Sequence, residues 1–306
     1  MTTGHERKLI LLTGANGQVG FELARSLQGL GHVVALDRAG LDLSDSEQIR
    51  RVVRELSPAL IVNAAAYTAV DAAESDVAAA MRLNADAPDI LAQEAKRLGA
   101  LLVHYSTDYV FDGMKDGPYE EDDATNPLNV YGKSKLAGEQ AIAASGCAHL
   151  ILRTSWVYGA RGKNFLRTML RLGGQREELS VVADQIGAPT WSRTIATMTS
   201  DVLSQLLVQD RDEWLQRSGI YHLTASGATS WCGFAQAVFD TSTLANKPVI
   251  KAIPTAAWSD LTAAGVPTAA VRPKNSRLSS QKLFATFGLK APDWREALTL
   301  CMEDLQ

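Results

Sequence analysis

Short apolar runs alternate with segments of helical periodicity through the first half of the chain. Runs that predict buried strands cover residues 8–13 (KLILLT), 32–37 (HVVALD), 59–64 (ALIVNA), 101–106 (LLVHYS) and 149–154 (HLILRT). Apolar positions at helical spacing predict helices over residues 19–30, 46–56, 77–98 and 131–144. Because strands that alternate with helices form right-handed crossovers, the pattern predicts an α/β fold with a parallel sheet covered on both faces.

Three glycines follow the first predicted strand and open the first predicted helix. Gly14, Gly17 and Gly20 have the spacing GxxGxxG. In such a turn the glycines allow a tight bend, close approach of the backbone to a pyrophosphate, and close packing of helix on strand. The phosphates then lie at the positive end of the helix. The motif in this position predicts a Rossmann-type, doubly wound parallel sheet that binds a dinucleotide.

The end of the second predicted strand gives opposite indications about the cofactor. Asp37 stands about 20 residues beyond the glycines, where an acid accepts hydrogen bonds from an adenosine ribose, which favours NADH. Arg38 could pair with a 2′-phosphate, which favours NADPH. Both cofactors therefore remain candidates. Asp42 and Leu43 are candidate adenine contacts, although Asp42 could instead be the N-terminal cap of the next helix.

The regular alternation weakens after about residue 156. Short apolar segments at residues 179–182 and 220–223 mix with helical segments at 195–207 and 231–241. Five prolines make the last third rich in loops: Pro248, Pro254, Pro267, Pro273 and Pro292. We expect residues 1–156 to form a dinucleotide-binding Rossmann domain, with a return segment near residues 192–220. Residues 157–306 should form mainly a smaller, mixed α/β C-terminal lobe that binds the substrate.

Tyr131 and Lys135 lie four residues apart on a predicted helix, so their side chains project from the same face. The preceding strand ends in Ser106, Thr107 and Asp108, at the carboxyl edge of the sheet where α/β folds bind ligands. An ammonium group near a phenol favours the phenolate, so we expect Lys135 to lower the pKa of Tyr131 from about 10 toward working pH. Such a tyrosine can exchange a proton with a carbonyl or alcohol oxygen.

The composition narrows the class of protein. The 306 residues are 46% hydrophobic and 21% charged, as in globular proteins, and the net charge of −4 does not indicate a nucleic-acid partner. The longest uncharged stretch, residues 218–239, is too polar to span a bilayer, and the N-terminus does not resemble a signal peptide. Cys147, Cys232 and Cys301 suit free thiols in a reducing compartment, so we expect a cytoplasmic protein. Neither the cysteines nor the five histidines have metal-ligand spacing.

Seven segments carry a resemblance to a known family. They are GANGQVG (14–20), VNAAAYTAVDAAES (62–75), VHYSTDYVFDG (103–113), PLNVYGKSKLAGE (127–139), RTSWVYG (153–159), DQIGAPT (184–190) and RPKNSRL (272–278). In this order they span nearly the whole chain, which resembles the extended short-chain dehydrogenases/reductases. The last three segments resemble, within that superfamily, the dTDP-4-dehydrorhamnose reductase family.

The resemblance implies roles for individual residues. It implies that the cofactor diphosphate contacts Gly17, Gln18 and Val19, the adenosine contacts Asp37, Asp42 and Leu43, and the middle of the cofactor contacts Ala64, Ala65 and Thr68. It implies a catalytic set of Thr107, Tyr131 and Lys135, and a sugar-nucleotide pocket lined by Asp108, Tyr109 and Trp156. Arg272 and Asn275 are candidates for contact with the substrate diphosphate, which needs charge-assisted donors. Trp156 also fits as a core aromatic residue, and Arg272 as half of a surface ion pair.

The resemblance also implies an activity. It is the NAD(P)H-dependent reduction of the C4 ketone of dTDP-4-dehydro-β-L-rhamnose to dTDP-β-L-rhamnose, the last step of dTDP-L-rhamnose biosynthesis. Tyr131 would give the proton, Thr107 would hydrogen-bond the same oxygen, and Lys135 would hold the nicotinamide ribose. The alternatives are another sugar-nucleotide epimerase or reductase of the superfamily, or a non-catalytic protein resembling the regulatory subunit of methionine adenosyltransferase.

One departure from the family concerns magnesium. Some members of the family are thought to dimerise through a magnesium ion held by acidic side chains, and Glu22 matches one of these positions. After the GAPT segment, however, this chain reads Trp191-Ser192-Arg193-Thr194, without a carboxylate. We therefore expect no catalytic metal and no metal-bridged dimer, and both a monomer and a homodimer remain open.

Overall fold

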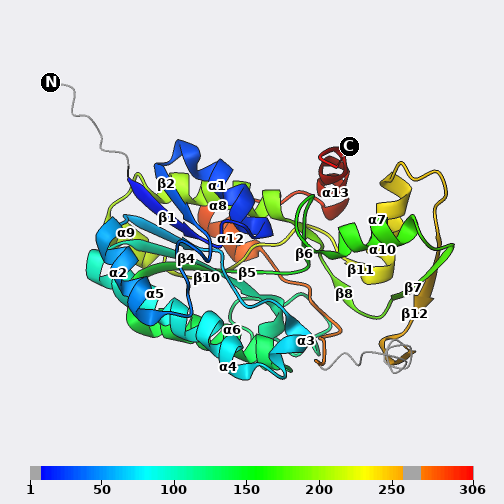
Figure 1. The fold of residues 1–306 in the computed structure, drawn as a ribbon, viewed down its shortest axis with the longest axis horizontal. Coiled ribbons are helices and arrows are strands. Elements are labelled where there is room, and N and C mark those ends of the chain that lie inside the picture. The colour runs from blue at the N-terminus through cyan, green and yellow to red at the C-terminus, as the bar shows by residue number, and fades with distance from the viewer. Residues whose placement is uncertain (1–7, 258–269, 306) are drawn as a thin grey trace.

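A six-stranded parallel sheet forms the centre of the molecule (Figure 1). The computed structural model describes residues 8–257 and 270–305. In spatial order the strands are β10 (Gly219–His222), β5 (Ala148–Thr154), β4 (Leu101–Thr107), β3 (Leu60–Asn63), β1 (Leu9–Thr13) and β2 (His32–Leu36). After β1 the chain forms β2 on one side of it, and β3 with its successors on the other. This reversal opens a crevice beyond the carboxyl ends of β1 and β3, the usual ligand position in such sheets.

Helices cover both faces of the sheet, as the alternation of strands and helices predicts. One face packs on α1 (Gln18–Ser26) and α8 (Ser192–Leu206), and the other on α2 (Ser46–Leu56), α5 (Ala87–Leu98) and α6 (Val130–Ser145). Strand β1 shows why both faces must be covered. Ile10 and Leu12 point into the first core and Leu11 into the second, and all three side chains are fully buried. The doubly wound α/β fold predicted from the sequence is thus confirmed.

The helix predicted over residues 77–98 is interrupted. It consists of α4 (Val77–Met81), a wider π-helical turn (Arg82–Asp86) and α5. Within the π turn, the buried Asn84 side chain accepts a hydrogen bond from the Tyr67 amide and donates one to the Ser134 hydroxyl. Helix α6 also approaches closely here, because a Cβ on Gly138 would lie 2.1 Å from the Asn84 carbonyl oxygen. Tertiary contacts of this kind favour a π bulge at the expense of regular helix.

The second half of the chain starts a separate core with residues 157–182, returns to the sheet, and then completes that core. Helix α8 packs beside α1, and β10 pairs with β5 as the sixth strand. The remaining helices are α3 (Val70–Ala73), α7 (Phe165–Gly173), α9 (Arg211–Gln216), α10 (Trp231–Thr241), α12 (Gln281–Phe287) and α13 (Trp294–Glu303). The other strands are β6 (Val157–Tyr158), β7 (Glu178–Val182), β8 (Ile186–Gly187), β9 (Thr190–Trp191), β11 (Thr229–Ser230) and β12 (Val249–Ile253).

A third apolar cluster lies apart from the two clusters that pack on the sheet. It gathers Tyr158, Leu166, Phe234 and Trp294 from β6, α7, α10 and α13. Helix α7 was not predicted from the sequence. The division of the chain at residue 156 into two domains stays a prediction, and the predicted loop residue Pro267 lies outside the described residues.

Two general expectations can be compared with the described residues. None of their helices is both long enough and apolar enough to cross a bilayer. The three cysteines, Cys147, Cys232 and Cys301, are unpaired.

Candidate active site

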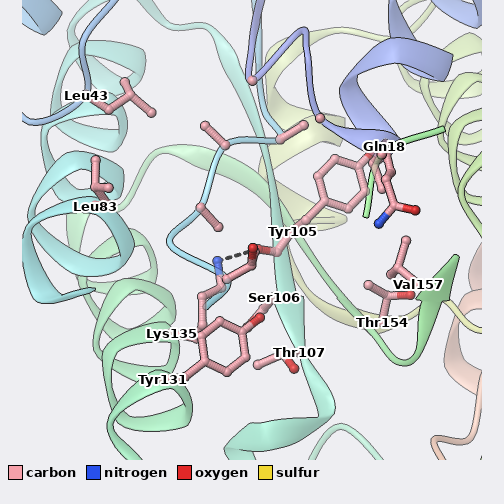
Figure 2. A pocket seen from close by; sticks show the side chains of 18 of the residues that line it. Gln18, Leu43, Leu83, Tyr105, Ser106, Thr107, Tyr131, Lys135, Thr154 and Val157 are labelled. Carbon is pink, nitrogen blue, oxygen red and sulfur yellow. Dashed lines mark hydrogen bonds between the residues drawn. The ribbon is translucent and has the colours of Figure 1, made fainter. Parts of the chain in front are cut away.

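A cavity of about 820 Å³ lies beyond the carboxyl ends of the central strands (Figure 2). Its lining comes from the glycine turn, the end of β2, the loops after β3, β4 and β5, and one face of α6. A volume of this size is typical of sites that bind a cofactor or a substrate. Most residues singled out from the sequence line it: Gly14, Gly17, Gln18, Val19, Asp37, Arg38, Asp42, Leu43, Ala64, Ala65, Thr68, Thr107, Asp108, Tyr109, Tyr131, Lys135 and Trp156.

The glycine turn brings backbone rather than side chains to the cavity. Gly14 has φ +69°, and a Cβ there would lie 2.7 Å from the Ala65 nitrogen. Gly20 does not line the cavity, because a Cβ on it would lie 2.1 Å from the Gly14 carbonyl oxygen. Gly17 caps α1 without a side chain, and the first turn of α1 contains no acidic residue. The amides at this helix end are therefore available to an anion such as a pyrophosphate.

The end of β2 presents a carboxylate and a guanidinium together. The Asp37 carboxylate accepts hydrogen bonds from the Ala39 amide (3.0 Å), the Gly40 amide (3.2 Å) and the Asn16 side chain (3.0 Å). These bonds lower the pKa of Asp37, so it stays ionised. The exposed Arg38 guanidinium lies 3.5 Å from the Asp42 carboxylate. A carboxylate and a guanidinium thus stand together at this end of the cavity, and the geometry favours neither cofactor.

The alternative role of Asp42 as a helix cap is wrong. Its carboxylate accepts bonds from the amide (2.9 Å) and hydroxyl (2.7 Å) of Ser44, within the loop. The N-terminal cap of α2 is Asp45, whose carboxylate accepts bonds from the amides of Glu47 and Gln48. An N-cap must stand directly before the first helical turn, and α2 begins at Ser46, too far along the chain for Asp42.

Helix α6 carries Tyr131 and Lys135 to the cavity. The Asn129 side chain caps the helix by accepting a bond from the Gly132 amide at 2.8 Å. Close packing holds its first turn, because a Cβ on Gly132 would lie 2.2 Å from the Tyr109 carbonyl oxygen. The Tyr131 phenol lies near the Thr107 hydroxyl at the end of β4. Tyr131 and Thr107 therefore point toward the same part of the cavity (Figure 2).

The expected effect of Lys135 on Tyr131 is wrong for the structure without a cofactor. Burial raises the pKa of Tyr131 to about 12; the nearby Thr107 hydroxyl opposes this rise and the Asp108 charge adds to it. The Lys135 amino group contacts β4 instead, with the Tyr105 carbonyl oxygen at 2.6 Å and His104 Nε2 at 3.0 Å. Burial lowers the pKa of Lys135 to about 8, while the Glu139 charge opposes the change. Desolvation thus outweighs the attraction between ammonium and phenolate.

The segment after β4 lines the other part of the cavity. Burial raises the pKa of Asp108 to about 6, although hydrogen bonds from Ser276 and Thr107 oppose the rise. Its Oδ2 atom has no hydrogen-bond partner among the described residues. Burial also raises the pKa of Tyr109, and the Arg272 charge opposes this rise. An acid with one free oxygen at a cavity wall is suited to accept a hydrogen bond from a ligand hydroxyl.

Trp156 has an unusual backbone conformation at the cavity. Its φ is +48°, which is rare for a large residue, and strain of this kind is common at functional sites. The indole ring stacks on Trp231, with ring centroids 3.6 Å apart. On the Trp156 ring edge, a Cβ added to Gly187 would lie 2.5 Å from Cε2. The residue is thus held at the cavity wall by Trp231 and Gly187, and it is not part of an apolar core cluster.

Two predicted substrate residues, Arg272 and Asn275, do not line the cavity in the described part of the chain. Arg272 forms an ion pair with Asp71 at 2.6 Å, the alternative raised from the sequence. Asn275 donates to the carbonyl oxygens of Lys115 (2.6 Å) and Gly117 (2.8 Å) and so ties two loops together. Both side chains are occupied by the protein, and their contact with a substrate stays a prediction.

Sequence reasoning missed other lining residues, among them Asn16, Ser155 and Lys163, and it gave Ser106 no role of its own. The Ser106 hydroxyl is buried and has no partner among the described residues. Ser106 lies at the end of β4, and a polar residue at a strand end is the signal that points to it. Lys163 belongs to a short loop without periodicity, so no pattern pointed to it.

The residues at the Glu22 position do not fit a magnesium site. The Glu22 carboxylate pairs with Arg193 at 3.2 Å, and Arg193 also pairs with Asp304 at 2.6 Å. A guanidinium therefore neutralises the carboxylate that a cation would need. Across residues 8–257 and 270–305, no group of three acidic, histidine or cysteine side chains could hold a metal ion.

Comparisons with known proteins place the chain in a family. Residues 7–306 match the family described as the RmlD substrate binding domain. The dTDP-4-dehydrorhamnose reductase of Burkholderia thailandensis is 52% identical over 303 residues, which cover 97% of this chain and 98% of that protein. The enzyme of the same name from Escherichia coli K12 is 44% identical, with 97% of each chain covered. Among solved structures, dTDP-4-dehydrorhamnose reductase from Bacillus anthracis in complex with NADP superposes with a TM-score of 0.86, at 36% identity, over 97% of this chain and 99% of that one.

Proposed function

Because the chain belongs to the family described as the RmlD substrate binding domain, we propose that it is an NAD(P)H-dependent reductase of a nucleotide sugar. The reaction is reduction of the C4 ketone of dTDP-4-dehydro-β-L-rhamnose to dTDP-β-L-rhamnose. The names of the relatives, which match over nearly their whole length, support this substrate. One observation carries the proposal: Thr107, Tyr131 and Lys135 line a single cavity that also contains the glycine turn.

The chemical roles follow from where the side chains lie. The reduced nicotinamide, when bound, supplies the hydride that reaches sugar C4. Tyr131 donates a proton to the developing alkoxide, since burial keeps its phenol neutral and its pKa at about 12. The Thr107 hydroxyl lies near the phenol and is positioned to bond the same substrate oxygen. Lys135, anchored on the Tyr105 carbonyl, has its remaining bonding capacity for the ribose of the cofactor.

The residues of the cavity fit a dinucleotide. The amides of α1, capped by Gly17, would meet the pyrophosphate, and the close contact between Gly14 and Ala65 leaves no side chain in its way. Asp37 and Arg38 would meet the adenosine end, with Asp42 and Leu43 beside them. Ala64, Ala65 and Thr68 would lie along the middle. No preference for NADH or NADPH is proposed.

The substrate would occupy the part of the cavity lined by Asp108, Tyr109 and Trp156. Asp108 Oδ2 would accept a hydrogen bond from a sugar hydroxyl, and Arg272 would reach a diphosphate if it exchanged its bond to Asp71. The proposed location is the cytoplasm, which the unpaired cysteines support. The proposed assembly state is a monomer, or a homodimer formed without a bridging metal.

The decisive assay follows NADPH absorbance when the purified protein meets the keto-sugar nucleotide. Reduction predicts stoichiometric loss of NADPH and formation of dTDP-L-rhamnose. An epimerase would convert the sugar without net oxidation of NADPH. A binding subunit would retain the nucleotide without turnover, so either result would contradict the proposed reduction.

A further inference from the structure

A row of buried polar side chains crosses the sheet beneath the cavity. Thr13, Asn63 and His104 stand at the same level of the adjacent strands β1, β3 and β4, because Thr13 pairs with Asn63 and Asn63 with His104 in the strand register. Each is 1% exposed. They point to the face covered by α6, as do the apolar residues two positions before them. The row ends at Lys135, which is also 1% exposed.

Hydrogen bonds connect the row continuously. The Thr13 hydroxyl lies 2.7 Å from Asn63 Oδ1, Asn63 Nδ2 lies 3.0 Å from His104 Nδ1, and His104 Nε2 lies 3.0 Å from the Lys135 amino group. Buried polar groups lower stability unless they are paired, and apolar side chains would fill these strand positions more simply. A paired polar row that leads to a cavity residue is therefore a candidate for a functional role.

The direction of the bonds is set at the Asn63 end. Asn63 Oδ1 also accepts a bond from the Ala65 amide at 3.3 Å, and a backbone N–H can only donate. The amide oxygen of Asn63 must therefore face Ala65, and its NH₂ group must face His104. His104 then accepts at Nδ1 and carries its ring hydrogen on Nε2.

This pattern has a consequence for Lys135. A hydrogen on His104 Nε2 needs an acceptor, and a lysine nitrogen accepts only as the uncharged amine. The amine still donates to the Tyr105 carbonyl oxygen at 2.6 Å. Burial of Lys135 lowers its pKa to about 8, which agrees in direction with this pattern.

Protonation of Lys135 reverses every bond in the row. An ammonium group can only donate, so His104 Nε2 must accept and the ring hydrogen must move to Nδ1. Asn63 must then turn its oxygen toward His104, and the Ala65 amide loses its acceptor. Thr13 fits both patterns because a hydroxyl can donate or accept. Burial keeps the His104 pKa well below its usual value, and the Lys135 charge lowers it further, so the ring changes tautomer without gaining a second proton.

We propose that Asn63 and His104 are positioning residues that couple the proton on Lys135 to the hydrogen bond holding the Ala65 amide. Ala64 and Ala65 line the cavity, so a ligand seated against them would act on the charge of Lys135 through this row. Coupling of this kind is reciprocal, so the charge of Lys135 would equally affect the affinity for that ligand. The coupling rests on the proposed function only in assigning Lys135 to the cofactor.

Other titratable or charged groups stand around Lys135 outside the row and do not connect it to Ala65. They are Tyr105 from β4, Asp108 after β4, Arg153 from β5, and Tyr131 and Glu139 from α6 itself; of these, the Glu139 charge opposes the lowering of the Lys135 pKa. Glu139 is bound by Arg153 at 2.7 Å, with both side chains 2% exposed. The pair is fixed in the core, so its effect on Lys135 should be constant while Asn63 is varied.

The test uses nuclear magnetic resonance of the full-length, cofactor-free protein. In ¹⁵N-histidine-labelled protein at high pH, we expect His104 to carry its hydrogen on Nε2, and to exchange it to Nδ1 as the pH falls through the titration of Lys135. The His104 signals are assigned by their loss in His104→Gln. A ring with hydrogen on Nδ1 at both pH values would overturn the proposal, and this measurement needs no variant of Asn63.

A double-mutant cycle tests the coupling itself, with ¹³C-lysine labelling to follow Lys135 and Lys135→Met to assign its signal. Asn63→Ala should raise the midpoint of the Lys135 titration by about one pH unit, the effect of roughly one hydrogen bond. In the His104→Phe background, the same change should have no effect. Thr13→Val is the matched control and should leave the midpoint unchanged. Equal shifts in both backgrounds would refute the coupling.

These measurements are independent of catalysis. A protein that shows the tautomer exchange but never oxidises NADPH would retain the coupling and lose the proposed reductase function. A protein that oxidises NADPH but shows no tautomer exchange would keep the proposed reductase function and lose the coupling.

Discussion

Tyr131→Phe removes the proposed proton donor with the smallest change of shape. The phenol pKa is raised to about 12 by burial, so at pH ~8 the neutral form exceeds the phenolate by about 10⁴-fold and the proton is present to be donated. The ring packs beside Tyr109, with centroids 5.5 Å apart, and phenylalanine keeps this contact. The variant should therefore fold and bind the cofactor.

The expected loss is in kcat. General acid catalysis contributes about 10²–10⁴-fold, which corresponds to roughly 2.7–5.4 kcal/mol of activation free energy. NADPH absorbance at saturating keto-sugar nucleotide measures kcat, and fluorescence titration measures cofactor binding. Because the phenol remains protonated, the wild-type rate should not fall through loss of this proton until the pH is well above 8.

The control is Tyr221→Phe, which removes a hydroxyl bonded to the Arg217 carbonyl oxygen in a buried position of β10 outside the cavity. It should lose about 1 kcal/mol of stability and little activity. If Tyr131→Phe kept a wild-type kcat while chemistry limited the rate, Tyr131 would not be the acid. Equal losses in both variants would show that the effect arises from packing.

Three further predictions, with four substitutions, test the rest of the reasoning. Wild-type kcat/KM values for NADH and NADPH should differ by less than about tenfold. Asp37→Ala should shift the preference toward NADPH, and Arg38→Ala should shift it toward NADH. If steady-state kinetics gave an unchanged NADH/NADPH ratio in both variants, these side chains would not determine the cofactor preference. Gly187→Ala should raise KM for the nucleotide sugar and leave the cofactor KM unchanged, because the methyl group would displace Trp156; equal rises in both constants would contradict this. Glu139→Gln should destabilise the protein by about 3–5 kcal/mol in urea unfolding, since it leaves the Arg153 guanidinium in the core without its carboxylate. A loss of stability below about 1 kcal/mol would show that water reaches the pair of Arg153 and Glu139.

Local patterns in the chain were sufficient for the architecture. Runs such as residues 8–13 and 101–106 are buried on both faces, and the helices between them show one apolar face, so the parallel sheet could be inferred. Helix boundaries could be predicted where the sequence carries a local signal. Helix α2, for example, begins at Ser46 and ends at Leu56, as predicted. The π turn of residues 82–86 could not be predicted, because contacts with α6 and the loop before α3 cause it.

The sequence by itself determined which residues stand near the carboxyl edge of the sheet. Chain order and strand ends place Gly14, Thr107 and Tyr131 there, since every strand of a parallel sheet ends at the same edge. Only the tertiary structure decided what these side chains contact. Lys135 contacts His104 and Tyr105 rather than the phenol one turn away, and Arg272 is paired with Asp71, 201 residues earlier in the chain.

The physical reason is that periodicity records which side of an element is buried, whereas partners depend on strand register and on packing between distant segments. The pKa values of Tyr131 and Lys135 likewise depend on packing between distant segments. The spacing of Tyr131 and Lys135 suggested attraction between two charges, but the desolvation that raises one pKa and lowers the other exists only once β4, α6 and the loops have closed around them.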